Sequence, residues 1–210
     1  MTGFHAIILA AGRSARMGRE KSSLPWLKGQ PLLLWMVEEL SVAGWSPVVV
    51  LRPEHFAFWE LALPKGCAVV NPDPDRGKTT SMAAGVEHVP PDAKWLLLTA
   101  VDQPRPPALY RRLREAAQTH SGRIIVPDRL GGRGHPVVLA GSLRNQLLAL
   151  DEGSKGLRGL LDAHREETCR LPVCDPAWLR WDLNSPGAYE EALAFFQSQL
   201  TERDQPLNPP

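Results

Sequence analysis

Residues 4–21, FHAIILAAGRSARMGREK, decide how this chain folds. The first seven, residues 4–10, are apolar and stop just before Gly12, a pattern typical of a buried strand that leads into a turn. The turn is rich in glycine and basic side chains, namely Gly12, Arg13, Arg16, Gly18, Arg19 and Lys21. A glycine-rich turn at a strand end exposes backbone N–H groups, which bind oxyanions. The stretch therefore predicts a phosphate-binding loop, with a basic surface turn as the alternative.

The loop differs from the two commonest nucleotide-binding loops. Five residues separate Gly12 from Gly18, and no Gly-Lys-Ser or Gly-Lys-Thr follows, so the sequence excludes a literal ATPase-type P-loop. The dinucleotide pattern Gly-x-Gly-x-x-Gly is also absent. Any phosphate site on this loop must therefore use another set of contacts.

Further apolar runs repeat the first strand, and helical patterns separate them. The expected strands are residues 4–10, 46–51, 68–70, 95–99 and 123–126. The expected helices between them are residues 31–43, 55–63, 79–88 and 107–120. This alternation predicts βαβ units and a mainly parallel sheet, whose strands are covered on both faces and therefore uniformly apolar.

The pattern changes after residue 126. Residues 136–140 predict a short strand, antiparallel to the others, and residues 168–173 predict another strand. Short helices are expected at 141–150 and 156–164, and a final helix at 186–200. We treat residues 1–200 as one domain and residues 201–210, which contain three prolines, as a tail.

Composition narrows the classes of function. The 24 basic and 23 acidic residues leave a net charge of +1, so we expect neither a nucleic-acid nor a membrane partner. Cys67, Cys169 and Cys174 lack the spacing of a zinc site or a disulfide framework. No signal peptide or membrane span is recognisable, and a cytoplasmic location is expected.

An acidic residue follows the fourth predicted strand. Residues 96–104, LLLTAVDQP, form an apolar run that ends at Asp102. In parallel α/β sheets, ligands lie beyond the carboxyl ends of the strands, where the glycine-rich loop is also expected. Mg2+ prefers carboxylate oxygens, waters and substrate phosphates. Asp102 is therefore the candidate metal ligand, and a simple turn-capping role is the alternative.

The sequence also resembles a known family. Residues 9–25, LAAGRSARMGREKSSLP, resemble the signature LAAGxSxRMGxxKxLLP of the nucleotidyltransferases that complete the molybdenum cofactor. The match is nearest to the cytidylyltransferase branch, because the guanylyltransferase branch usually has LAGG where this chain has LAAG. The resemblance implies a three-layer, Rossmann-like α/β fold. It assigns nucleotide binding to Leu9, Ala10, Ala11, Gly12, Arg13, Ser14 and Lys21, and catalysis to Arg16, Lys21 and Asp102.

Motifs further along the chain extend the resemblance. Two elements of this family lie near the nucleotide. The first is matched here by Asn71 and Pro72 followed by Gly77, and the second by the segment TTSMAAG, which contains Ser81. Capping of a helix is an equal alternative for residues 79–81. The segment GGRGHP resembles a GxxGHP element, in which His135 contacts the acceptor or only holds the loop. In DLNSP, residues 182–186, the resemblance offers Asn184 or Asp182 as a second Mg2+ ligand, while Ser185 is a candidate helix cap.

These motifs imply an enzyme that transfers a nucleoside monophosphate from an NTP to a phosphorylated acceptor and releases pyrophosphate. CTP is the expected donor, molybdopterin the expected acceptor and Mg2+ the expected cofactor, with a molybdoenzyme as a possible recipient of the product. The alternatives are a GTP-dependent guanylyltransferase, a sugar-phosphate nucleotidyltransferase and a non-catalytic nucleotide-binding maturation factor. All the catalytic readings require Lys21 and Asp102 to share one cavity.

Overall fold

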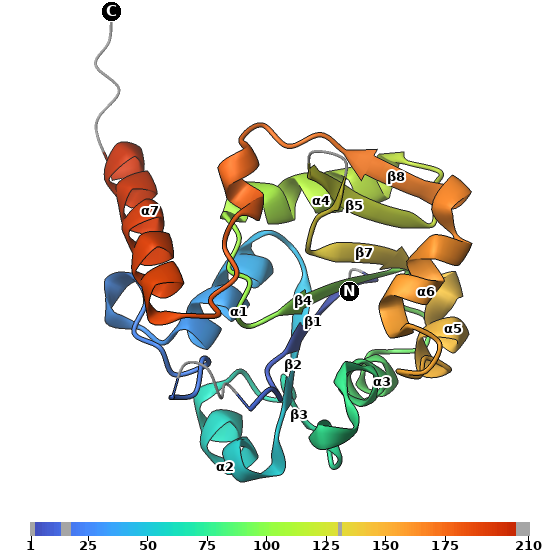
Figure 1. The fold of residues 1–210 in the computed structure, drawn as a ribbon, viewed down its shortest axis with the longest axis horizontal. Coiled ribbons are helices and arrows are strands. Elements are labelled where there is room, and N and C mark those ends of the chain that lie inside the picture. Colours follow the sequence, from blue (N-terminus) through green and yellow to red (C-terminus); the bar gives the residue numbers. More distant parts are fainter. Residues whose placement is uncertain (1–2, 14–17, 130–131, 205–210) are drawn as a thin grey trace, which may run out of the picture.

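The computed structural model describes residues 3–13, 18–129 and 132–204, and their core is a single mixed sheet (Figure 1). The strands run in the order β3-β2-β1-β4-β7-β5-β6, and β8 pairs with β5. Their bounds are β1 Phe4–Leu9, β2 Ser46–Leu51, β3 Ala68–Val70, β4 Trp95–Ala100, β5 Ile124–Arg129, β6 Gly132–Arg133, β7 Val137–Ala140 and β8 Thr168–Leu171.

The pairing confirms the predicted mainly parallel sheet. Strand β1 runs parallel to β2 and β4, β2 to β3, and β5 to β8. Strand β7 is antiparallel to both of its neighbours, β4 and β5, as residues 136–140 indicated. The two-residue strand β6 adds a small antiparallel pairing with the end of β5 that the sequence pattern did not predict.

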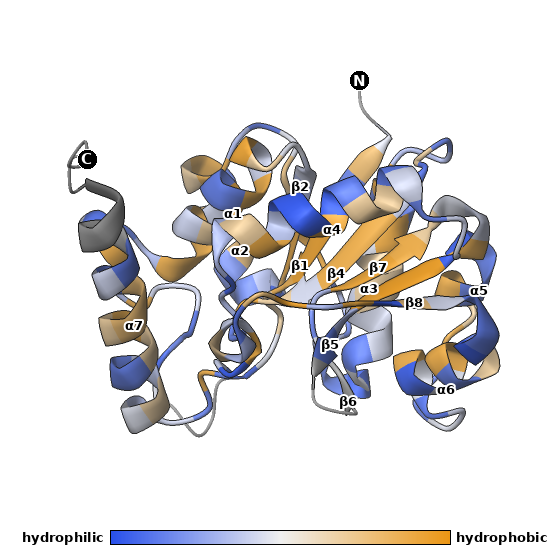
Figure 2. Ribbon diagram, turned by 90° about the horizontal axis from the view of Figure 1, so that it is seen from above, coloured by the Kyte–Doolittle hydropathy of each residue, from blue (hydrophilic) through white to orange (hydrophobic). Residues whose placement is uncertain are grey.

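Helices cover both faces of this sheet, which gives the predicted three layers (Figure 2). Helices α1, α2, α4 and α7 pack on one face, and α3, α5 and α6 pack on the other. Their bounds are α1 Leu32–Val42, α2 Pro53–Ala62, α3 Lys78–His88, α4 Pro107–Thr119, α5 Arg144–Leu148, α6 Gly156–Ala163 and α7 Pro186–Asp204.

Six strands, β1 to β5 and β7, each contribute to two separate hydrophobic cores. In β1, Ala6 and Ile8 pack with α1 and α4, whereas Ile7 packs with α3. Because successive strand residues point to opposite faces, a strand covered on both sides must be apolar at every position. This double burial is why the strands could be recognised from continuous apolar runs.

The structure departs from the sequence predictions mainly at element ends. Strand β5 continues to Arg129 rather than residue 126, because polar Asp128 and Arg129 still pair with β6. Helix α7 continues to Asp204, so residues 201–204 of the predicted tail are helical; they contain helix-forming residues and no proline. Helix α2 begins at Pro53, because proline is favoured in the first turn. Among the described residues, no helix has the length and apolarity required to cross a bilayer.

Candidate active site

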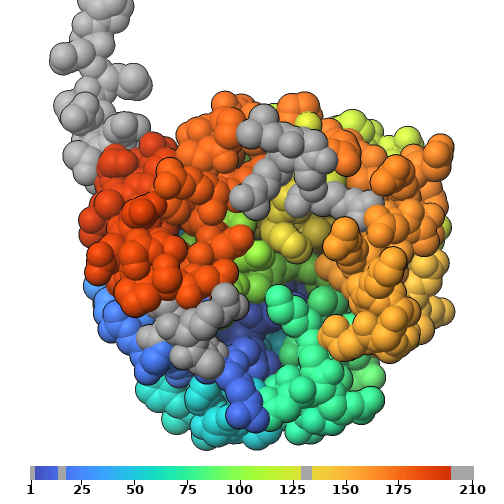
Figure 3. All heavy atoms as spheres, in the orientation of Figure 1, coloured from blue at the N-terminus to red at the C-terminus, as the bar shows by residue number. Residues whose placement is uncertain are grey.

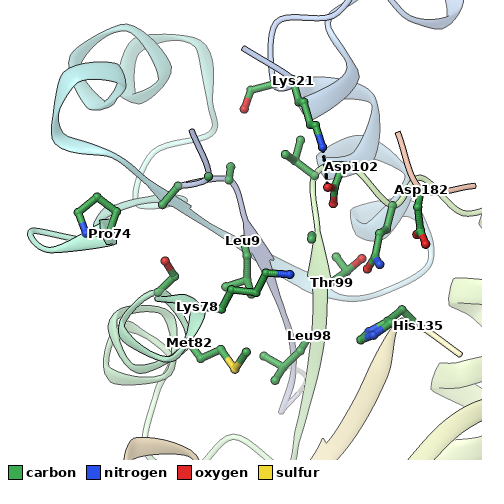
Figure 4. A pocket seen from close by; sticks show the side chains of 18 of the residues that line it. Leu9, Lys21, Pro74, Lys78, Met82, Leu98, Thr99, Asp102, His135 and Asp182 are labelled. Atoms are coloured by element: carbon green, nitrogen blue, oxygen red, sulfur yellow. Dashed lines mark hydrogen bonds and ion pairs between the residues drawn. The ribbon is translucent and has the colours of Figure 1, made fainter. Parts of the chain in front are cut away.

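A cavity of about 650 Å³ opens at the carboxyl ends of β1 and β4 (Figures 3 and 4). The chain leaves β1 toward β2 and β3 on one side and later returns to β4 on the other, so this point is where the strand order reverses. Such switch points are the usual ligand sites of open α/β sheets. The predicted site residues that line the cavity are Leu9, Ala10, Ala11, Gly12, Lys21, Gly77, Ser81, Asp102, His135, Asp182 and Asn184.

Lys21 lies at the centre of the polar part of this cavity. Its Nζ donates to Asp102 Oδ2 at 2.8 Å and to Asn184 Oδ1 at 3.1 Å. Figure 4 shows the ammonium group of Lys21 directed at Asp102. The Lys21 side chain is only 11% exposed and that of Asp102 26%, so water screens this ion pair weakly. Lys21 and Asp102 therefore share one cavity, as every catalytic reading of the sequence required.

Backbone hydrogen bonds hold these three side chains together. The N–H of Val101 donates to Leu9 O at 3.1 Å and joins the end of β4 to the end of β1. The N–H of Leu183 donates to Asp102 O at 2.8 Å and brings the segment before α7 to the same place. Residues that are far apart in the sequence thus meet because three chain segments are bonded at one edge of the sheet.

The oxygen atoms around Lys21 fit a hard divalent cation. Asp102 and Asn184 direct one oxygen each to a single point, which the Lys21 ammonium fills in this structure. Mg2+ commonly takes one or two carboxylates and completes its coordination with substrate phosphates and water. Within the described ranges no group of three His, Cys, Asp or Glu side chains could hold a metal. Any cation bound here would thus rely on the nucleotide for further ligands.

Asp182, the other candidate ligand, is engaged elsewhere. Its Oδ1 accepts a hydrogen bond from Arg105 Nη2 at 3.4 Å. Asn184 rather than Asp182 is therefore the partner of Lys21 and Asp102. Ser185 acts as the predicted helix cap, because its Oγ accepts from the N–H of Ala188 at 3.2 Å.

Arg105 is a site residue that the sequence analysis missed. Its side chain is only 2% exposed and donates to the backbone oxygens of Pro104, His135 and Trp181. It therefore connects the loop after β4, the loop that carries His135 and the segment that carries Asp182. Its position directly after the Asp-Gln-Pro motif was the only signal in the sequence, and a lone arginine there indicates no partner.

The basic residues of the glycine-rich loop do not all face the cavity. Arg13 pairs with Asp75, and Arg52 Nη1 donates to Asp75 Oδ1 at 3.1 Å and to Ala11 O at 3.2 Å. Hydrogen bonds from both arginines hold the pKa of the Asp75 carboxyl well below its usual range. Arg13 is therefore absent from the cavity lining, contrary to the expected phosphate contact. Ser14 and Arg16 lie outside the described residues.

Asn71 does not line the cavity but contacts a residue that does. It is 1% exposed, and its Nδ2 donates to Thr80 Oγ1 at 2.9 Å and to Ser81 Oγ at 2.8 Å. Asn71 thus positions Ser81, which lines the cavity, without lining it itself. The nucleotide contact expected from its motif stays a prediction, and the structure shows Asn71 in contact with Ser81 instead of the cavity.

The start of α3 is capped differently from the sequence prediction. Gly77 is the N-cap residue, and the N–H of Thr79 donates to Glu152 Oε1 at 3.0 Å. Residues 79–81 lie inside the first turn, so none of them is the cap. Gly77 has a φ of 125°, a conformation that residues with a Cβ rarely adopt, so the backbone here favours glycine.

Two further polar side chains face the cavity from its other side. His135 lines it, and burial, together with the positive charge of Arg105, lowers the pKa of its imidazole. Thr99 also lines it, and its buried Oγ1 has no hydrogen-bond partner in the described part of the chain. Figure 4 shows both residues on the same side of the cavity, away from Lys21.

Comparisons with known proteins agree with the fold. The model of the MobA-like NTP transferase domain matches residues 6–168. A molybdenum cofactor guanylyltransferase of Rhodopseudomonas palustris is 33% identical over 161 residues, which cover 70% of this chain and 72% of that protein. Another, from Xanthomonas euvesicatoria, is 36% identical over 100 residues, which cover 47% of this chain and only 46% of that protein.

A solved structure extends the likeness to nearly the whole chain. The crystal structure of Rv0371c from Mycobacterium tuberculosis superposes with a TM-score of 0.75 at 27% identity, covering 92% of this chain and 98% of that one. The sheet order, the cavity at the ends of β1 and β4, and the family match over most of the sequence agree with one another. The chain belongs to the MobA-like NTP transferase family.

Proposed function

We propose that this nucleotidyltransferase transfers a nucleoside monophosphate from an NTP to the terminal phosphate of molybdopterin and releases pyrophosphate. The observation that carries the proposal is Lys21, held between Asp102 and Asn184 in the cavity that the glycine-rich loop borders. A shielded cation beside a carboxylate at a switch point suits a triphosphate and its counter-ion. The relatives named above support molybdopterin as the acceptor.

Different residues of this chain have different roles in the proposed reaction. The N–H of Ala10 donates to Val50 O, so the backbone N–H groups of Ala11 and Gly12 bind the phosphate oxygens, and Lys21 neutralises charge that develops at the α-phosphorus. Arg16 has the same expected role. A divalent cation, for which we propose Mg2+, would be held by Asp102 and Asn184 and would neutralise the triphosphate. The acceptor phosphate is ionised at neutral pH, so positioning and charge stabilisation suffice without a strong general base.

The base of the donor distinguishes two versions of this function. Ala11, in the LAAG sequence, favours CTP, whereas the names of the relatives favour GTP. Thermal unfolding with CTP, GTP, ATP or UTP, each with Mg2+, measures the preference, because a ligand that binds the native state raises its melting temperature. We expect the largest shift with CTP. A larger shift with GTP would assign the chain to the guanylyl donor instead.

Pyrophosphate release tests the transfer itself. The reaction contains the protein, the preferred NTP, Mg2+ and molybdopterin, and separate controls omit each one. We expect release only in the complete mixture and a fall of about 100-fold or more in Asp102→Ala. Lys65→Ala, which removes an exposed lysine away from the cavity, is the matched control. Nucleotide-dependent stabilisation without any release would identify a nucleotide-binding maturation factor and refute the proposed transfer.

A further inference from the structure

A second cavity of about 570 Å³ adjoins the first. It lies between the first turns of α3, the helix α6 and strand β8. Lys78, Met82, His135 and Leu157 line both cavities. A ligand in the second cavity can therefore extend into the first, where Lys21 and Asp102 lie.

The second cavity is markedly basic although the chain as a whole is nearly neutral. Its lining contains five basic side chains, Lys78, Lys155, Arg158, Arg165 and Arg170, against two acidic ones, Glu152 and Asp162. Arg170 pairs with Asp128 at 3.3 Å, and the Glu152 carboxylate accepts from the backbone of Thr79. None of the other four basic side chains forms an ion pair with another described residue. The local excess of positive charge is therefore available to an anion.

The floor of this cavity is apolar. Met82 and Leu161 are almost fully buried, and Leu157, which lines both cavities, packs against the same hydrophobic cluster. An apolar floor below a basic rim suits a ligand that combines a ring system with negative charge. Inorganic phosphate, which has no ring system, would contact only the basic side chains of the rim and not the apolar floor.

The backbone brings the rim and the floor close together. Lys155 and Gly156 have φ values of 65° and 51°, and an added Cβ at Gly156 would lie 3.3 Å from Thr79 Cγ2. Helix α6 therefore approaches α3 closely at its first turn. A left-handed conformation at a lysine is uncommon, and here it places Lys155 at the rim of the cavity.

We propose that the second cavity is the acceptor subsite of this enzyme: its basic rim binds a phosphorylated pterin, its floor holds the ring system, and the reacting phosphate extends past His135 toward Lys21. The name of the acceptor rests on the proposed function. The binding of an anionic ring compound rests on the cavity alone.

Equilibrium binding of a pterin phosphate ester tests this subsite without any turnover. Neopterin monophosphate is titrated into the full chain and followed by its own fluorescence, and neopterin without phosphate is the second ligand. In Arg158→Glu/Arg165→Glu we expect the Kd of the phosphate ester to rise by about tenfold or more, because two attractive charges become repulsive. The Kd of the preferred NTP should change by less than about twofold.

A matched variant separates a local effect from a change in total charge. Arg111 is an exposed arginine on α4 that lines neither cavity, and Arg111→Glu should leave the Kd of the phosphate ester unchanged. If the double variant fails to fold, the single changes Lys155→Gln and Arg158→Gln replace it, each with an expected rise of about threefold.

Four results would overturn the proposed subsite. They are no binding of the phosphate ester to the wild-type chain, equal affinity for neopterin with and without its phosphate, an unchanged Kd in the charge-reversed variant, or an equal loss of NTP affinity. The proposed transfer can fail separately. A chain that binds the ester through Arg158 and Arg165 but releases no pyrophosphate retains the subsite and loses the enzymatic function.

Discussion

Two clusters of charged side chains flank the first cavity, and they differ in their access to water. In the inner cluster, Lys21 contacts Asp102 and Asn184, and the Lys21 and Asp102 side chains are 11% and 26% exposed. In the outer cluster, Arg13 and Arg52 share Asp75; Arg13 and Asp75 are 69% and 47% exposed, whereas Arg52 is 10% exposed. Shielding from water, more than contact distance, decides how strongly each cluster acts on a ligand.

The two clusters therefore serve the cavity in different ways. The inner one places a weakly screened positive charge where phosphates are expected, so we assign it to binding and catalysis. The outer one connects the glycine-rich loop to the loops after β2 and β3 through Ala11, Arg52 and Asp75, so we assign it to the shape of the loop. If this division is right, changes to the inner cluster reduce turnover strongly, and changes to the outer one have smaller effects.

The largest effect is expected for Lys21→Ala. Loss of the ammonium group removes a preorganised charge from the reacting phosphates, and turnover should fall by about 100-fold or more. Steady-state pyrophosphate release measures this effect, and urea unfolding checks that the variant is folded. Near-normal turnover in Lys21→Ala would remove the inner cluster from the reaction and end the distinction between the two clusters.

Arg105→Ala should have the next largest effect, on stability. The change leaves the buried oxygens of Pro104, His135 and Trp181 without their shared donor, and an unsatisfied buried group costs about 1–3 kcal/mol. We expect the free energy of unfolding to fall by about 2 kcal/mol in urea denaturation. Arg105→Lys, which keeps the charge but not the three-way donation, should recover only part of the loss. Equal stability of all three proteins would contradict this role of Arg105.

Arg52→Ala should raise the KM for the donor by about fivefold and leave kcat nearly unchanged. The reason is that Arg52 holds the carbonyl of Ala11 in place but lines no part of the cavity. Initial rates over a range of NTP concentrations separate the two constants. A fall in kcat as large as that of Lys21→Ala would show that the outer cluster takes part in the reaction itself.

The sequence was most informative where the site depends on strand ends. Lys21 and Asp102 follow two apolar runs, and parallel strands place their carboxyl ends at one edge, so their meeting could be predicted from local patterns. The position of Asn184 next to them depends on a backbone bond from Leu183 to Asp102, which no local pattern reveals. Its assignment came only from the family resemblance.

Sequence patterns were less informative about long side chains and about the second cavity. Arg13 was expected at the phosphates, yet its side chain reaches Asp75 in another loop, because a flexible arginine pairs with whichever carboxylate the fold brings near. The basic residues of the second cavity come from α3, from α6 and the residues that flank it, and from β8. Their relative positions depend on the antiparallel strand β7 and on the pairing of β8 with β5, which are long-range features of the sheet.

The smallest effect is expected for Asp75→Asn, and its pH dependence is the sharpest test of the outer cluster. The pKa of Asp75 lies below its usual value in the folded protein, because Arg13 and Arg52 donate to its carboxylate. In the unfolded chain this carboxyl has its ordinary pKa near 4, so below that pH the unfolded state binds more protons than the folded state. The stabilisation by Asp75 is therefore complete above about pH 5 and decreases as the pH falls further. Urea midpoints from pH 2 to pH 7 should show a small, salt-sensitive gap between wild type and Asp75→Asn that is constant above about pH 5 and narrows steadily as the pH falls to 2, with turnover at pH 7 changed by less than about twofold. A gap of the same size at pH 2 and pH 7, unaffected by high salt, would mean that Asp75 acts through packing rather than charge, and the contrast between the two clusters would then no longer rest on exposure to water.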